Sequence, residues 1–237
     1  MVFAREIAGQ TLTFGVSGKL IMNALVMYDH QSDTLWSQFL SRGVKGPLVN
    51  QALEIVPAVQ TTWEHWVKLH PDTLVLDKRG SYQGDRYEGY YNGGSAGILG
   101  ESNKDKRLPS KELVMGMTVS GLAKAYLFSA ISQQTVINDH FAGEEVVVTF
   151  EPLSESGAVF ERKLGGRTLN FEPAAVREGI ALMRDLETGS LWQVLTGQAI
   201  EGPLFGQRLE RLPSHYSFWF AWSDFHPQTG LYGSASG

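Results

Sequence analysis

The chain has 237 residues, 43% of them apolar, which is enough for one large domain or two small ones with a packed core. A net charge of −5 without any Lys/Arg-rich run argues against a nucleic-acid partner, and no apolar run is long enough for a membrane span or a signal peptide. Zero cysteines exclude disulfides, thiolate metal sites and cysteine nucleophiles. The apolar content and the absence of a membrane span together predict a soluble globular protein.

An internal repeat organises the chain. Residues 3–14 are identical to residues 160–171 at six of twelve positions, and residues 25–74 are identical to residues 181–230 at sixteen of fifty. We therefore predict a tandem duplication, with a first repeat at 1–74 that is truncated at its N-terminus, a linker or extended loop at 75–110, and a second, complete repeat at 111–237. We expect all three to form one compact unit. The matched residues include Asp29/Asp185, Trp36/Trp192, Trp63/Trp219, Trp66/Trp222 and His70/His226.

The strands are predicted as hairpins. Residues 113–119, 136–139 and 145–150 are each predicted to be a strand, because they contain β-branched and other apolar residues and are separated by turn residues. In the second repeat, a Gly-Gly step at 165–166 and Gly189 each separate two more short runs. The predicted fold is mainly β (β-rich α+β), with two duplicated hairpin-rich lobes that carry short helices and are related by a pseudo-twofold axis.

Each repeat also carries one predicted helix. Residues 218–225 follow Ser217 as an N-cap, and the matching helix of the first repeat follows Thr61 or Thr62. Both end at a His-Pro step, because the residue before proline disfavours the α region. The two tryptophans of each helix are three residues apart and share one face, which favours core packing over an aromatic ligand platform.

Several motifs together resemble a known family. They are Phe-Gly-Val-Ser-Gly-Lys-Leu at 14–20, Leu-Val-Met-Tyr-Asp at 25–29, Gly-Pro-Leu at 46–48, Thr-Trp at 62–63, His-Pro at 70–71 and Val-Ile-Asn-Asp at 136–139. This set is similar to that of the prokaryotic family known as domain of unknown function 3179. The resemblance covers nearly all of 1–74 and 111–232, and it implies no agreed activity.

One stretch departs from that family. Members often carry Cys-Pro-Leu-Cys, sometimes with selenocysteine first, where this chain has Glu151-Pro152-Leu153-Ser154. The resemblance thus marks Glu151 and Ser154 as degenerate redox-motif positions, at which thiol or selenol chemistry cannot occur. The first repeat's counterpart would precede Met1, so we expect that the sequence starts late.

The polar residues Ser17, Lys19, Asn23 and Tyr28 occur in only one repeat and mark a candidate site. Together with Asp29, they are predicted to cluster around a concavity that also receives Asn138 or Asp139. The alternatives stay open: a glycine-containing turn with a solvated lysine, and an aspartate that accepts hydrogen bonds from its own turn.

No metal site and no cofactor are predicted. His70 and His226 stand at helix ends, where a cation is favourable, so capping explains them better than metal ligation. The chain contains no His-Glu-x-x-His motif, calcium loop or phosphate-binding glycine loop. This argues against a metal at His65 and His140 without excluding one.

Two functional hypotheses follow. We favour a non-catalytic or degenerate module that binds a small molecule or a protein. The alternative is an enzyme, either a thiol or selenol oxidoreductase with its motif upstream of Met1 or a hydrolase built on Ser17, Lys19 and Asp29. Self-association through an open sheet edge is a further expectation. The family resemblance implies an extracytoplasmic location if the N-terminus is truncated.

Overall fold

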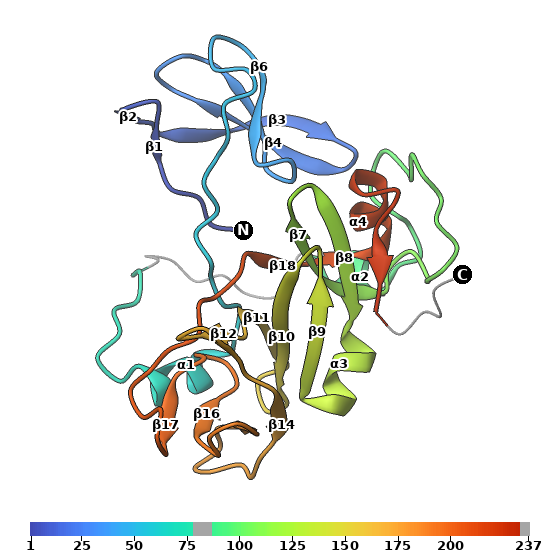
Figure 1. The fold of residues 1–237 in the computed structure, drawn as a ribbon. Coiled ribbons are helices and arrows are strands. Elements are labelled where there is room, and N and C mark those ends of the chain that lie inside the picture. The colour runs from blue at the N-terminus through green and yellow to red at the C-terminus, as the bar shows by residue number, and fades with distance from the viewer. Residues whose placement is uncertain (78–86, 233–237) are drawn as a thin grey trace. The chain divides into compact units, whose positions relative to one another are not determined.

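The computed structural model describes residues 1–77 and 87–232, and these form two compact units (Figure 1). Unit 1 comprises Met1–Ala58, Ser95–Leu127 and Pro213–Gly237, and unit 2 comprises Val59–Gly94 and Phe128–Leu212. Both are mainly β, as predicted. Each unit combines segments that are far apart in the sequence, so the compact units are divided differently from the predicted ranges 1–74, 75–110 and 111–237.

Unit 1 contains two four-stranded sheets and a small hairpin, β1–β2. The first sheet is an antiparallel meander in the order β3-β4-β5-β6. The second has the order β18-β7-β8-β19, in which only β19 runs parallel to its neighbour. The elements are β1 (Glu6–Ile7), β2 (Gln10–Thr11), β3 (Phe14–Ile21), β4 (Ala24–Asp29), β5 (Leu35–Ser37), β6 (Arg42–Lys45), β7 (Leu113–Val119), β8 (Leu122–Leu127), β18 (Ser214–Phe218), α4 (Trp219–Phe225) and β19 (Gly230–Leu231).

Unit 2 has a three-stranded sheet in the order β11-β10-β9, a four-stranded meander β14-β15-β16-β17 and the hairpin β12–β13. Its elements are α1 (Trp63–Leu69), α2 (Glu88–Asn92), α3 (Phe128–Gln134), β9 (Val136–Phe141), β10 (Glu144–Glu151), β11 (Ser156–Glu161), β12 (Lys163–Leu164), β13 (Arg167–Thr168), β14 (Phe171–Pro173), β15 (Leu182–Asp185), β16 (Leu191–Gln193) and β17 (Ala199–Glu201). Helix α2 lies within the predicted linker 75–110, of which residues 78–86 are outside the described residues.

Each of the two helices with a tryptophan pair packs in the unit that holds the meander from the other half of the sequence. Helix α1 comes from the first half of the sequence, yet its Leu69 packs on the core of unit 2 around Trp192. Helix α4 comes from the end of the sequence and packs through Trp219 and Trp222 on Val114 of unit 1. Figure 1 shows the teal α1 beside the orange β16 and the red α4 beside the green β7.

The same turn occurs in both meanders. Trp36 Nε1 donates to Asp29 Oδ2 over 2.8 Å, and Trp192 Nε1 donates to Asp185 Oδ2 over 2.8 Å. Both indoles are fully buried. A glycine then lets a second strand approach: a Cβ on Gly46 would lie 2.8 Å from the Thr34 Cα, and one on Gly202 would lie 2.7 Å from the Ser190 Cα.

The helix boundaries confirm one predicted cap and correct another. Thr62 caps α1, because its Oγ1 accepts from the His65 N–H. Ser217 does not cap α4: it pairs with Val114 inside β18, and Phe218 stands at the N-cap without a side-chain hydrogen bond. Sheet pairing thus extends the strand past the serine. His70 and His226 are the C-caps, as predicted.

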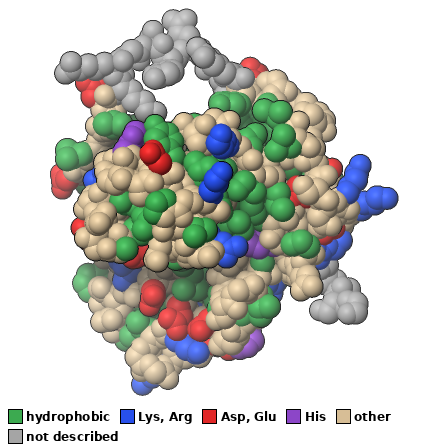
Figure 2. Space-filling view, turned by 90° about the horizontal axis from the view of Figure 1, so that it is seen from above, with side chains coloured by type: hydrophobic (Ala, Val, Ile, Leu, Met, Phe, Trp, Pro, Cys, Tyr) green, Lys and Arg blue, Asp and Glu red, His purple; other side chains and the backbone are tan. Residues whose placement is uncertain are grey.

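Core packing was predicted for all four helix tryptophans, and for Trp63 this is wrong. Trp219 and Trp222 are 0% exposed and Trp66 is half-buried, whereas Trp63 is 55% exposed. On the face shown in Figure 2, apolar side chains lie among charged ones of both signs. Within the described part of the chain, no helix has the length and apolarity needed to cross a membrane.

Candidate functional site

Ser17 and Lys19 lie at a bulge in β3, where the pairing with β4 shifts between Val16 and Lys19. The Ser17 hydroxyl donates to the Val26 carbonyl over 2.5 Å and accepts from the Lys19 N–H over 3.1 Å. The Lys19 residue is exposed. The hydroxyl therefore fastens the bulge to the neighbouring strand, and its proton is directed at a backbone oxygen.

Asn23 and Tyr28 stabilise their own surroundings. Asn23, at the β3–β4 turn, donates to the Gly100 carbonyl and accepts from the Leu99 N–H, each over 2.7 Å, so it anchors the loop at 99–100. The Tyr28 ring covers Gly15, whose Cβ position lies 2.6 Å from the Tyr28 Cε1. Tyr28 also meets the His30 ring edge-on at 4.9 Å.

Asp29 holds its own turn together. Its carboxylate accepts from the backbone N–H groups of Gln31, Ser32 and Thr34 in addition to the Trp36 indole. Burial disfavours the charged form, but the hydrogen bonds outweigh this and hold the pKa of Asp29 below its ordinary value. The turn-forming interpretation of Asp29 is confirmed. Asn23 and Asp29 stand at opposite ends of β4, ~20 Å apart along the strand.

Asn138 and Asp139 belong to unit 2, whereas the other five candidates belong to unit 1. The Asn138 amide donates to the Phe171 carbonyl over 2.7 Å and accepts from the Phe171 N–H over 2.8 Å, so it ties β9 to β14. Asp139 Oδ1 accepts from the His140 N–H over 2.8 Å. Asn138 therefore extends the pairing between two sheets with a side chain.

Glu151 is the last residue of β10, and Ser154 lies in the turn that leads to β11 in unit 2. Glu151 is 0% exposed, and its Oε2 accepts from the Ala181 N–H over 2.8 Å while its Oε1 accepts from the Leu153 N–H over 3.3 Å. Ser154 is 8% exposed, and its Oγ has no hydrogen-bond partner. Two backbone amides thus orient a carboxylate that is wholly inside the protein.

Helix α1 brings an imidazole to this carboxylate. His65 is 3% exposed, and its Nε2 lies 3.6 Å from Glu151 Oε2, which is too long for a hydrogen bond. The Nε2 atom has no other partner, and the buried Thr61 Oγ1, two residues before α1, has none either. Buried polar atoms are normally paired, so this pair of His65 and Glu151, called the buried cluster below, needs an explanation.

The sequence alone did not predict that His65 and Glu151 lie next to each other. One signal was present: His65 corresponds to Ala221 in the matching helix, so the imidazole occurs in only one of the two helices. In the described ranges, 1–77 and 87–232, no group of three or more His, Cys, Asp and Glu side chains could hold a metal ion. The buried cluster is therefore a two-sided site with one imidazole and one carboxylate, not a closed metal cage.

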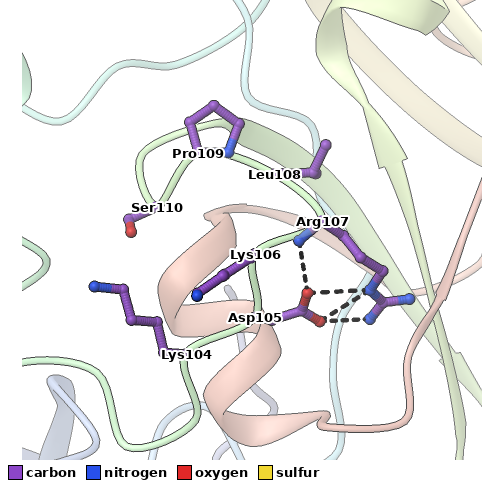
Figure 3. Close-up of a pocket in the computed structure, with 7 residues that line it drawn as sticks. All are labelled: Lys104, Asp105, Lys106, Arg107, Leu108, Pro109 and Ser110. Atoms are coloured by element: carbon purple, nitrogen blue, oxygen red, sulfur yellow. Dashed lines mark hydrogen bonds and ion pairs between the residues drawn. The ribbon is translucent and has the colours of Figure 1, made fainter.

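A surface pocket of about 330 Å³ lies in unit 1 and is lined by Lys104 to Ser110 (Figure 3). The Arg107 Nε and Nη2 groups donate hydrogen bonds to the Asp105 carboxylate. These bonds lower the pKa of Asp105 and outweigh its burial, which raises the pKa. The Arg107 guanidinium also lies 5.1 Å from the Trp219 ring centroid, and Trp219 Nε1 donates to the Asp105 carbonyl. Arg107 and Asp105 therefore have a structural role, because they hold this loop against Trp219 of α4.

The family model described as "Protein of unknown function (DUF3179)" matches residues 1–229. No curated protein and no solved structure matches the chain.

Proposed function

From the premise that the chain belongs to the DUF3179 family of proteins of unknown function, we propose that it is a non-catalytic binding protein whose unit 2 holds a small cation between His65 and Glu151. The observation that carries this proposal is the unpartnered Nε2 of His65, 3.6 Å from a carboxylate that is 0% exposed. The ligand class is a metal ion or a small ammonium ion.

The charge of Glu151 supports a cation. A buried carboxylate is costly unless a positive charge and hydrogen bonds compensate it. Two backbone N–H groups reach its oxygens, but the imidazole stops short of hydrogen-bond distance. A separation of 3.6 Å fits two atoms that bind one ion, because metal bonds to imidazole nitrogen and carboxylate oxygen measure ~2.0–2.2 Å.

The hydrogen bonds of the other candidates support a non-catalytic role. A hydrolase built on Ser17, Lys19 and Asp29 needs a base next to the hydroxyl, but the Ser17 proton is directed at a backbone carbonyl. The Asp29 carboxylate is taken up by its own turn and by the Trp36 indole. Glu151 and Ser154 supply no thiol.

The chain is also proposed to be a tandem duplication. Supporting pairs of hydrogen bonds recur at an offset of 156: Trp66 to Thr73 with Trp222 to Thr229, and the Leu48 N–H to Thr34 with the Leu204 N–H to Ser190. A duplicated fold has two places for each side chain, and a histidine in only one of them marks a feature that the fold itself does not require.

Calorimetric titration with zinc chloride, and separately with methylammonium chloride, tests the cation site. We expect one cation per chain to bind, and His65→Ala and Glu151→Gln to weaken binding by about tenfold or more. His140→Ala is the matched control, because His140 is an exposed imidazole 2.9 Å from the Glu145 carboxylate in the same unit.

The pattern of binding decides between outcomes. Zinc alone identifies a metal ion, and methylammonium alone identifies an organic cation. If neither cation binds, or if only His140→Ala weakens binding, the proposal is wrong. Circular dichroism of each variant shows whether a loss of binding reflects unfolding, and His65→Ala tests the site independently should Glu151→Gln fail to fold.

A further inference from the structure

In unit 1, a β-hairpin fills the space between the strands that flank helix α4. Strand β18, just before the helix, pairs with β7, and β19, just after it, pairs with β8. The hairpin β7–β8 packs directly on the helix. A Cβ on Gly116 of β7 would lie 2.2 Å from the Trp222 ring, so glycine is needed where the strand crosses the indole.

Unit 2 contains the same helix with its flanks but without such a hairpin among the residues described. Residues 59–62 match His215–Phe218 of β18, and Leu74 and Val75 match β19, yet none of these is in a strand. Leu74, Val75 and Leu76 are 95%, 69% and 80% exposed. Trp63 is 55% exposed, where its counterpart Trp219 is 0% exposed.

Helix α1 itself is built like α4. Trp66 Nε1 donates to Thr73 Oγ1 over 2.9 Å, as Trp222 does to Thr229 over 2.8 Å. The Trp66 and His70 rings are 4.2 Å apart, and those of Trp222 and His226 are 4.3 Å apart. The difference in exposure therefore comes from the surroundings of the helix and not from its own conformation.

We propose that unit 2 docks a two-stranded antiparallel β-hairpin of the β7–β8 type, between residues 59–62 and 74–76 and against Trp63 and Trp66. Extended edges with unpaired backbone groups recruit strands, and alternate side chains then provide specificity. The required partner has apolar strands and a glycine that faces Trp66. This docking face is separate from the buried cluster, because Trp63 and Trp66 lie three residues apart on one helical face while His65 points to Glu151.

The probe is a synthetic peptide with residues 111–127 of this chain, added to the full-length protein. We expect it to bind, and hydrogen exchange at residues 59–62 and 74–76 to slow by about tenfold or more on binding. The matched control peptide carries Gly116→Val, which keeps the strand propensity but adds a side chain where the ring must pass. We expect it to bind at least tenfold more weakly.

A protein variant tests the same face from the other side. Val75→Pro removes a backbone N–H from the receiving edge and should weaken peptide binding without affecting the cation site. The inference is overturned if the peptide does not bind at ~1 mM, where even weak complexes form, or if the Gly116→Val peptide binds equally well. It is also overturned if protection appears only at β18 and β19, because the peptide then replaces the hairpin of unit 1.

Discussion

Helices α1 and α4 have the same length, end at the same His-Pro step and make the same Trp–Thr hydrogen bond, yet one is covered and the other is largely open. In α4 both tryptophans are fully buried, whereas Trp63 of α1 is 55% exposed. The comparison shows that local sequence sets the conformation of such a helix and that the surrounding strands set its burial.

The two meanders show the opposite case, in which two regions make matching interactions. In both turns the aspartate accepts from the tryptophan Nε1 and from the hydroxyl of the residue three positions further on, and the aspartate and tryptophan side chains are buried. Where two regions share every interaction, the residues involved maintain the fold. Where they differ, as at His65 and Ala221, a specific role is to be sought.

The largest expected effect concerns those shared turns. Asp29→Ala leaves a buried indole N–H and three backbone N–H groups without an acceptor, and Asp185→Ala leaves a buried indole N–H and the Thr188 N–H without one. Each should reduce the free energy of unfolding by about 4 kcal/mol. Urea denaturation measures the loss, and hydrogen exchange at residues 31–36 and 187–192 locates it. Asp33→Asn, at an exposed carboxylate in the first turn, is the control. A large loss in one turn and none in the other would break the comparison.

A pH effect should distinguish the units. Burial, reinforced by the positive charges of the N-terminus and of His226, lowers the pKa of His215 from 6.5 to about 4. Between these values the unfolded chain takes up a proton that the folded protein resists. The stability is therefore full above pH 6.5 and falls as the pH drops to about 4, by about 3 kcal/mol in total. The matching position of unit 2 is Val59.

The measurement is urea denaturation of the wild type and of His215→Phe from pH 7 to pH 4. The phenylalanine keeps an aromatic ring beside Phe39, which meets His215 edge-on at 5.1 Å, but it does not titrate. We expect the variant to lose less stability on acidification than the wild type. Equal losses for the two proteins would rule out His215 as the cause.

The smallest expected effect concerns the glycines beside the turns. Gly46→Ala and Gly202→Ala place a Cβ against the Thr34 and Ser190 backbone at φ values of +120° and +96°, and each should cost about 2 kcal/mol. Gly206→Ala has φ +82° but open space around it and should cost about 1 kcal/mol. Thermal denaturation ranks the melting temperatures of the three variants. If Gly206→Ala lowers the melting temperature as much as the other two substitutions, contact between the new Cβ and the neighbouring backbone is not the cause of the loss.

Much of the fold is predictable because it is encoded locally. The strand predicted at 113–119 is β7, and the turns at Gly165-Gly166 and Gly189 have the positive φ that glycine permits. The turn role of Asp29 follows from its position before a tight hairpin. Ser217 shows the limit, because pairing with Val114 extends β18 through a residue that is a good N-cap in isolation.

The sequence by itself determined the hairpins, the two helices with their His-Pro ends and the membership of the family, since each depends on neighbouring residues or on a motif. Only the tertiary structure decided that α1 packs with unit 2, that Trp63 is exposed and that His65 meets Glu151. The physical reason is that burial and the meeting of side chains 86 positions apart depend on which distant segments pack together, and no local pattern encodes that choice.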